Sequence, residues 1–295
     1  MGLTNSKDQK VYKKGVLYDE SFRKRLRSFD IVFFNGGELI SDLIEYCSKK
    51  EVIEYDDTRA KQVDKKSLPN ISHVGMILRS DVFDSSVPNI QPDKIYIFES
   101  ILSGRLSDGV NNVDGKAFLG VQLRDFDEVF KANDTGKSGD DTEIAVGFLS
   151  DRVRETIFNN FDRDERTLRE EFTKLYHRYN GVRYDYNPID LLSTIWKWIR
   201  IFRKPVQHVT GSEKWLFCSE LLSTLFIGLG VFMGKTETDK IESTHESVIL
   251  KSMCVNPEDV LPIDFTGVRP SVCPLIIDLP ITYIVGKDHY QSLTS

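Results

Sequence analysis

The chain has 295 residues, of which 40% are apolar and 28% charged, a composition typical of a folded globular protein. Its net charge is −6, which argues against a general nucleic-acid-binding protein. The four cysteines form neither a C-x-x-C pair nor another metal-binding spacing, and no secretory signal is visible. A reducing, cytoplasmic setting without a metal or other cofactor is therefore expected.

The N-terminal segment differs from the rest in charge. Residues 1–30 carry eight Lys or Arg against four acidic residues, and the first six, MGLTNS, fit the pattern for N-myristoylation of Gly2. One myristoyl chain binds a membrane only marginally, and a basic patch is the usual second signal. We expect residues 1–24 to be a basic tail that attaches the protein peripherally to a membrane. A polar tail without lipid is the alternative.

Apolar periodicity predicts strands and helices along the rest of the chain. Strands are expected at residues 29–34, 71–78, 94–100, 118–123, 143–149 and 275–285. Helices are expected at residues 38–48, 151–179 (with a break at 162–164), 189–202, and from 218 to the glycines at 228 and 230. Residues 49–70 and 125–141 are interpreted as loops. Gly75, inside a strand, indicates a close approach by another backbone or side chain.

Two of these helices allow a membrane interpretation. Residues 189–202 combine Trp196 and an apolar face with basic residues, so this helix lies either in a membrane interface or on the protein core. Residues 215–233 are nearly long enough to cross a bilayer. Glu220 lies within that stretch, which favours a core helix.

Three residues have the chemistry of a cysteine hydrolase. Cys218 begins the last predicted helix, where the helix dipole favours the nucleophilic thiolate. His73 and Glu99 lie on predicted strands, and pairing of those strands would bring the two side chains together. An imidazole that pairs with the thiolate and a polar group that orients the imidazole complete such a site. An inert, buried Cys218 is the alternative.

These segments resemble one enzyme superfamily. The matching motifs, in chain order, are FDIVFF (29–34), LISDLI (39–44), SHVGMI (72–77), IFES (97–100), GVRYDY (181–186), FCSELL (217–222) and NPEDV (256–260). In this order they look like the permuted NlpC/P60 papain-like hydrolases, the YiiX/YaeF-like and poxviral-type branch. In that family the histidine strand precedes the cysteine helix. The resemblance covers about residues 29–262.

The resemblance implies a function and a fold. It implies Cys218 as nucleophile, His73 as base and Glu99 as orienting residue, with Tyr184, Ser72 and Ser219 at the substrate pocket. The expected fold is α+β: a circularly permuted papain-like domain over residues 25–295, with an antiparallel sheet against the nucleophile helix and a helical insertion at about 151–210.

The expected reaction is hydrolysis or transfer of an acyl group from a peptide, amide, ester, thioester or lipid, through an acyl-enzyme. A viral, virion-associated origin is also implied. The alternative is a membrane-tethered binding or scaffolding protein that keeps the fold without turnover.

Overall fold

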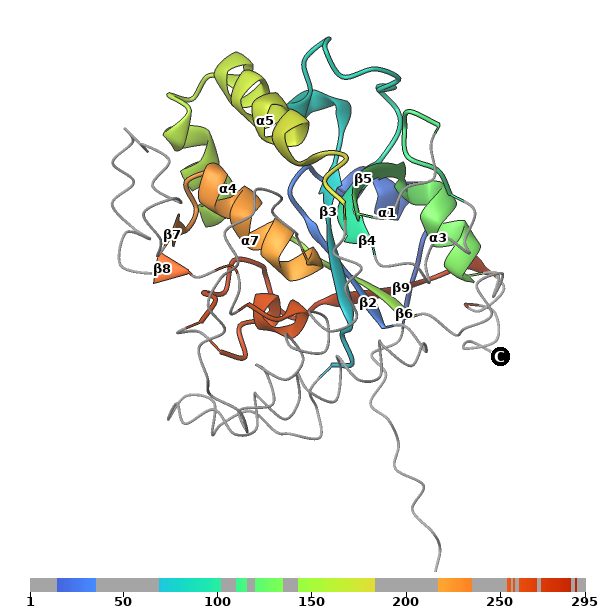
Figure 1. Ribbon diagram of the computed structural model, residues 1–295. Coiled ribbons are helices and arrows are strands. Elements are labelled where there is room, and N and C mark those ends of the chain that lie inside the picture. The colour runs from blue at the N-terminus through green and yellow to red at the C-terminus, as the bar shows by residue number, and fades with distance from the viewer. Residues whose placement is uncertain are drawn as a thin grey trace, which may run out of the picture.

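The computed structural model describes residues 15–35, 69–101, 110–115, 120–134, 143–183, 217–234, 254–255, 257, 260–269, 272–287 and 290. Its centre is a seven-stranded sheet in the order β1-β9-β6-β2-β3-β4-β5 (Figure 1). The strands are β1 (Val16–Leu17), β2 (Ile31–Asn35), β3 (His73–Leu78), β4 (Tyr96–Ile101), β5 (Gly120–Asp125), β6 (Glu143–Gly147) and β9 (Thr282–Val285). All neighbours are antiparallel except β1 and β9, which are parallel.

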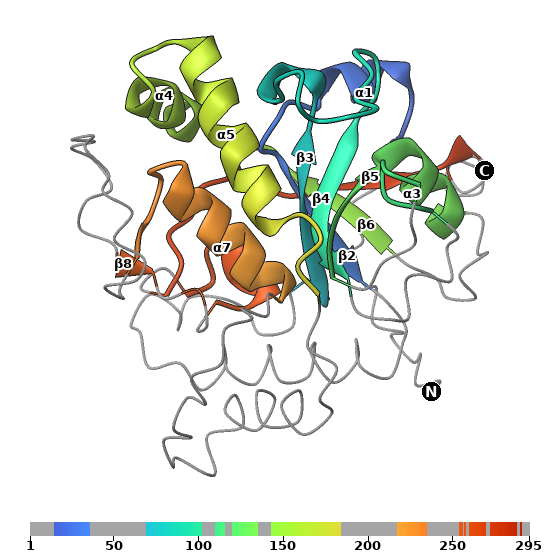
Figure 2. The same ribbon diagram turned by 45° about the horizontal axis from the view of Figure 1, so that its top comes forward.

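Helices cover both faces of this sheet (Figure 2). One face carries α4 (Asp151–Asn160), α5 (Glu165–Tyr179) and α7 (Cys218–Gly228), and the other carries α1 (Glu20–Arg25) and α3 (Phe126–Asp134). Short 3-10 helices η3 (Ser80–Val82) and η7 (Pro262–Thr266) and a two-stranded pair, β7 (Met233–Gly234) with β8 (Cys254–Val255), complete the elements described. The fold is therefore α+β, as expected.

Double coverage explains the composition of the central strands. Ile31 and Phe33 of β2 belong to the apolar cluster that includes α7, whereas Val32 and Phe34 belong to the cluster that includes α3. Successive side chains of a strand point to opposite faces, so a strand buried on both sides is an unbroken apolar run. This is why residues 31–34 are all apolar and all buried.

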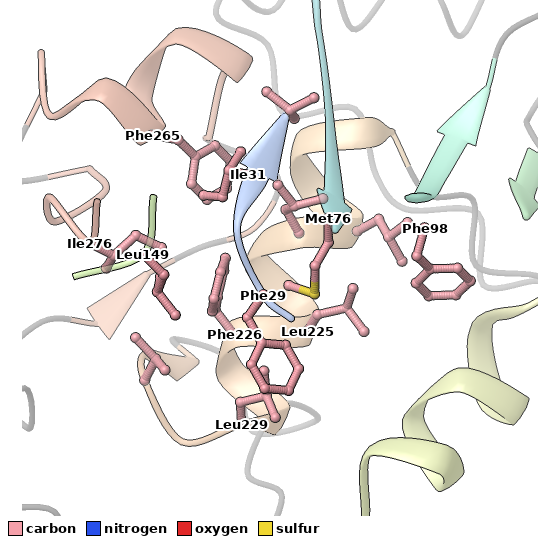
Figure 3. Packing of buried hydrophobic residues seen from close by; sticks show 14 of the residues in the cluster. Phe29, Ile31, Met76, Phe98, Leu149, Leu225, Phe226, Leu229, Phe265 and Ile276 are labelled. Carbon is pink, nitrogen blue, oxygen red and sulfur yellow. The ribbon is translucent and has the colours of Figure 1, made fainter. Parts of the chain in front are cut away.

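The α7 helix packs its apolar side directly on the sheet. Figure 3 shows Leu225 and Phe226 of α7 against Ile31 of β2 and Met76 of β3. These side chains are fully buried, and burying a large apolar side chain contributes roughly 1.5–3 kcal/mol. The helix ends at Gly228, and Gly230 follows with a positive φ of 71°, as the sequence predicted. Packing of this length of helix fixes the position of its first residue at the sheet.

The predicted break in the region 151–179 is confirmed. Ser150 caps α4, and Asp164 caps α5 by accepting from the backbone N–H groups of Arg166 and Thr167. Between the two helices, Asp162 and Arg163 have positive φ values of 55° and 57°, which ends the first helix. Gly181, with φ of 82°, follows the end of α5, as expected.

One loop prediction is wrong: residues 125–141 begin with a helix, α3. Phe126, Val129 and Phe130 recur at helical spacing and are buried, and the Asp125 carboxylate accepts from the backbone N–H of Glu128 at 3.2 Å. The acidic and basic residues of this helix gave the segment the polarity of a loop, but they occupy its solvent side.

Part of the predicted N-terminal tail belongs to the folded domain. β1 extends the sheet beside β9, and Phe22 of α1 is buried in the second cluster. Gly2 and the predicted helices at 38–48 and 189–202 lie outside the described residues. In the part of the chain that the structure describes, no helix is both long and apolar enough to cross a bilayer.

Candidate active site

His73 and Glu99 form the first contact of the site. His73 begins β3 and Glu99 lies on the neighbouring β4, and both are buried. The ring Nε2 of His73 and Oε2 of Glu99 are 2.6 Å apart, the length of a charge-assisted hydrogen bond. Since Nε2 faces the carboxylate, Nδ1 is the nitrogen that remains for a partner on the other side of the ring.

Glu99 is held in turn by Arg124, on the next strand, β5. Its Oε1 accepts hydrogen bonds from Nε of Arg124 at 3.1 Å and from Nη2 at 2.8 Å. Both side chains are 0% exposed. One oxygen of the carboxylate therefore faces an imidazole and the other faces a guanidinium, and the ring orientation of His73 is fixed from behind.

Arg124 is buried although β5 is at the edge of the sheet, because the segment 110–115 covers it. Asn112 pairs with Arg124 across an antiparallel bridge, and its Oδ1 accepts from the backbone N–H of Leu123 at 3.0 Å. The carbonyl oxygen of Val110 lies 3.5 Å from Nη1 of Arg124. The edge strand is thus closed, and the buried cation has polar partners.

Cys218 is the first residue of α7, and its thiol lies close enough to the His73 ring for each group to shift the pKa of the other. The backbone N–H groups of Val74 and Ser219 also lie near the thiol and help to lower its pKa. Phe217, the residue before the helix, has no side chain that caps α7, and its backbone N–H donates to the Glu220 carboxylate at 3.4 Å. The predicted chain of cysteine, histidine and glutamate is thus assembled in space.

The thiol and the imidazole come from opposite sides of the sheet. Val74 and Met76 of β3 pack with α7, while Ile77 belongs to the other cluster, and by alternation His73 points to the side of Ile77. Its ring accordingly lies 5.4 Å from the ring of Phe34. Among the described residues, the pairing of β3 with β4 starts at Met76, three residues after His73. Cys218 therefore meets the ring where the two strands are not paired.

Gly75 provides the space that this arrangement needs. A Cβ atom at Gly75 would come within 2.6 Å of Cδ1 of Ile97 and 3.2 Å of Cβ of Glu99. Such distances are below ordinary van der Waals contact, so a side chain here would push Glu99 away from His73. The predicted close approach at Gly75 is confirmed.

Charge determines how these groups titrate. Burial alone would raise the pKa of Glu99, but Arg124 and His73 bring this pKa down to about 2. Burial would lower the pKa of His73, but the charge of Cys218 and the hydrogen bonds to Cys218 and Glu99 raise it. Burial would raise the pKa of the Cys218 thiol, but His73 and the two N–H donors lower it. All three shifts favour a thiolate, an imidazolium and a carboxylate.

Of the other predicted pocket residues, two lie next to the thiol–imidazole pair in the sequence, and the third lies outside the residues that the structure describes. The hydroxyl groups of Ser72 and Ser219 are buried and donate to backbone carbonyls, of Phe34 at 3.3 Å and of Val260 at 2.7 Å. These bonds hold the backbone on either side of the thiol–imidazole pair. Tyr184 lies outside the described residues.

Arg124 is the site residue that sequence reasoning missed. On β5, apolar Val121 and Leu123 alternate with Gln122 and Arg124, a pattern typical of a strand with one face in solvent. The signal that could have identified Arg124 lay on the neighbouring strand, β4. A buried Glu99 needs a positively charged partner, and position 124 of β5 lies on the same face of the sheet as Glu99.

Neither a scan against protein-family models nor a search of curated proteins finds a match to this chain. Within the described ranges, no group of three or more His, Cys, Asp or Glu side chains could hold a metal ion. The function is therefore inferred from the geometry and charge of the site.

Proposed function

We propose that the protein is a cysteine hydrolase or acyltransferase with a circularly permuted papain-like fold. The observation that carries the proposal is the pairing of the Cys218 thiol with His73, whose ring is hydrogen-bonded to the buried Glu99 at 2.6 Å. The chain order, with the histidine and glutamate strands before the cysteine helix, and the packing of α7 on an antiparallel sheet support the permuted fold.

In the proposed reaction, the Cys218 thiolate attacks the carbonyl carbon of an amide, ester or thioester. A carbon–sulfur bond forms, and the carbonyl electron pair moves to oxygen. As the tetrahedral intermediate collapses, the bond to the leaving group breaks, and the His73 imidazolium gives that group its proton. The product is a thioester between the acyl group and Cys218.

In the second half of the reaction, neutral His73 takes a proton from water or another acceptor, which attacks the thioester. The acyl group leaves with the new oxygen or nitrogen, and the thiolate and imidazolium are restored. Glu99 stays ionised throughout because its pKa is about 2, so it stabilises the imidazolium and does not take the proton itself.

The start of α7 suits the negative charge of the tetrahedral intermediate. The backbone N–H of Ser219 lies near the sulfur and lowers the pKa of the thiol, and the positive end of the helix dipole lies at Cys218. Preorganised N–H donors at the position of a developing oxyanion typically contribute a factor of about 10²–10³ in rate. A peptide, amide or lipid acyl group is a suitable substrate for this chemistry.

The test is covalent capture with an acyl-donor probe. An activated ester that carries a reporter acyl group is incubated with the protein, and the labelled peptide is identified by mass spectrometry. We expect a hydroxylamine-sensitive thioester on Cys218, and no label at that position in Cys218→Ala. Labelling of Cys218 no faster than a free thiol in solution would favour the scaffolding alternative.

We further propose peripheral attachment to a membrane through a myristoyl group on Gly2 and the basic residues that follow it. Co-expression with an N-myristoyltransferase should add one myristoyl mass to the intact protein. Binding to anionic vesicles should weaken with added salt and be lost in Gly2→Ala. An unmodified N-terminus under these conditions would refute the lipid anchor and leave the thiol chemistry untouched.

A further inference from the structure

Arg124 ends the chain of charged groups that begins at the thiol. It is the largest fully buried side chain of the described core, and a completely buried arginine is rare without a dedicated partner. Its partner is Oε1 of Glu99, at 2.8 Å from Nη2, while Oε2 of the same carboxylate lies 2.6 Å from His73. The guanidinium is thus one carboxylate away from the imidazole.

When the thiol is ionised and the imidazole is protonated, the charges of the four groups cancel. Arg124 and protonated His73 contribute two positive charges, and Glu99 and the Cys218 thiolate contribute two negative charges. Without Arg124 the site would hold one excess negative charge, and protonation of the sulfur would remove it. Without Glu99 it would hold one excess positive charge, and loss of the imidazolium proton would remove that. Charges this deeply buried are weakly screened, so an imbalance is costly.

We propose that Arg124 is a positioning residue that balances the charge of the site, so that the thiolate–imidazolium pair exists at acidic and neutral pH. This inference rests on the proposed function, because it assigns Arg124 a role in keeping the nucleophile ready. It differs from a structural role, in which Arg124 would hold β5 to β4 without affecting the titration of Cys218.

The charged and titratable groups around the pair come from four elements. Within the described residues they are His73 on β3, Glu99 on β4, Arg124 on β5 and, on α7, Cys218 itself with Glu220 two residues later. The Glu220 carboxylate is engaged with the backbone N–H of Phe217. Glu99 and Arg124 are the two groups whose removal changes the buried charge next to the imidazole.

A second arginine–carboxylate pair, with a buried carboxylate and a partly buried arginine, provides a control. Arg154 is bonded to the buried carboxylate of Asp30, next to β2, at the end of the sheet remote from His73. Arg154→Met should destabilise the fold as Arg124→Met does. It should leave the chemistry of Cys218 unchanged, because no group of the site contacts it.

The experiment measures the titration of Cys218 and His73 without a substrate. Cys218 is alkylated with iodoacetamide across a range of pH, and the His73 ring is followed by NMR. In Arg124→Met, alkylation at pH 5 should be slower by about tenfold or more, since one pKa unit is a factor of ten. Arg124→Lys, which keeps the charge, should stay near the wild type. In Glu99→Gln, the imidazolium should instead be lost at lower pH.

The double variant Arg124→Met/Glu99→Gln tests the charge-balancing role of Arg124 even if Arg124→Met alone does not fold. Because it restores the charge balance, its imidazolium should persist to higher pH than in Glu99→Gln. Identical His73 titrations in these two variants would overturn the inference and leave Arg124 a structural residue. A wild-type Cys218 that reacts only as an ordinary thiol would instead refute the proposed function itself.

Discussion

Cys218 and Cys273 are two free thiols whose side chains the structure describes, and burial alone would raise the pKa of both. At Cys273 burial dominates and the negative charge of Asp264 adds to it, so the pKa rises well above its ordinary value despite Arg269 nearby. At Cys218 the neighbour is His73, whose positive charge and hydrogen bond lower the pKa. The sign of the neighbouring charge therefore sets the direction in which the pKa of each thiol moves.

Removing each thiol in turn should give the largest contrast. Cys218→Ala should lower hydrolysis of an activated ester or thioester by about 10⁴-fold or more, because the nucleophile is lost. Its melting temperature should change little, since Cys218 is only partly buried. Cys273→Ala should behave in the opposite way, with the rate retained and about 1–2 kcal/mol of stability lost to the cavity. Rate loss in Cys273→Ala with a folded protein would contradict this division.

Neutralising the carboxylate behind His73 should have a smaller but still large effect. We expect Glu99→Gln to slow acylation of Cys218 by about 10²-fold, because glutamine can orient the ring but cannot balance its charge. The buried Arg124 would lose its counter-charge, at a cost of about 3–5 kcal/mol in stability. Stopped-flow acylation and chemical denaturation measure the two effects. An unchanged acylation rate would show that Glu99 does not act on the imidazole.

Gly75→Ala should affect the site through packing alone. The added Cβ would press on Ile97 and Glu99, so we expect acylation to slow by about tenfold, with about 1–3 kcal/mol of destabilisation. Gly147→Ala is the matched control: its Cβ would meet Ile277 at 2.6 Å and Phe33 at 2.9 Å, in the core rather than at the site. Equal rate losses in the two variants would mean that general destabilisation, and not the position of Glu99, is responsible.

Ser219→Ala should have the smallest effect. Its hydroxyl donates to the carbonyl of Val260 inside the protein, so the variant should lose about 1 kcal/mol of stability. Acylation should stay within about threefold of the wild type, because only the backbone N–H of Ser219 contacts the sulfur. A rate loss comparable to that of Glu99→Gln would instead assign the hydroxyl to the substrate pocket.

The sequence predicts the structure correctly where the local pattern of residue types fits a single kind of element. The apolar run of β2, the helix that starts at Cys218 and the break at 162–164 follow from periodicity and turn chemistry, and the structure confirms them. The pairing of His73 with Glu99 followed from placing the two residues on strands expected to be neighbours. In each case local pattern and tertiary packing favour the same structure.

It predicted poorly where tertiary contacts reverse the local pattern. Arg124 has the alternation of a solvent-facing residue, yet the segment 110–115 covers its strand. The α3 helix was mistaken for a loop because its charged side dominates its composition. Nor does the sequence show where the pairing of β3 with β4 begins, although that point determines how Cys218 reaches His73. Such features depend on which segments lie over the sheet, which a single sequence does not encode locally.

The central claim is that His73 keeps Cys218 ionised, and the pH dependence of alkylation in the wild-type protein tests it most directly. Folded protein is treated briefly with iodoacetamide at a series of pH values, and both cysteines are quantified by peptide mass spectrometry. The account predicts that the rate at Cys218 levels off at a pH below the ordinary thiol pKa near 8.5, while Cys273 stays unmodified until the protein unfolds. A Cys218 rate that still rises about tenfold per pH unit between pH 7 and 8 would contradict it.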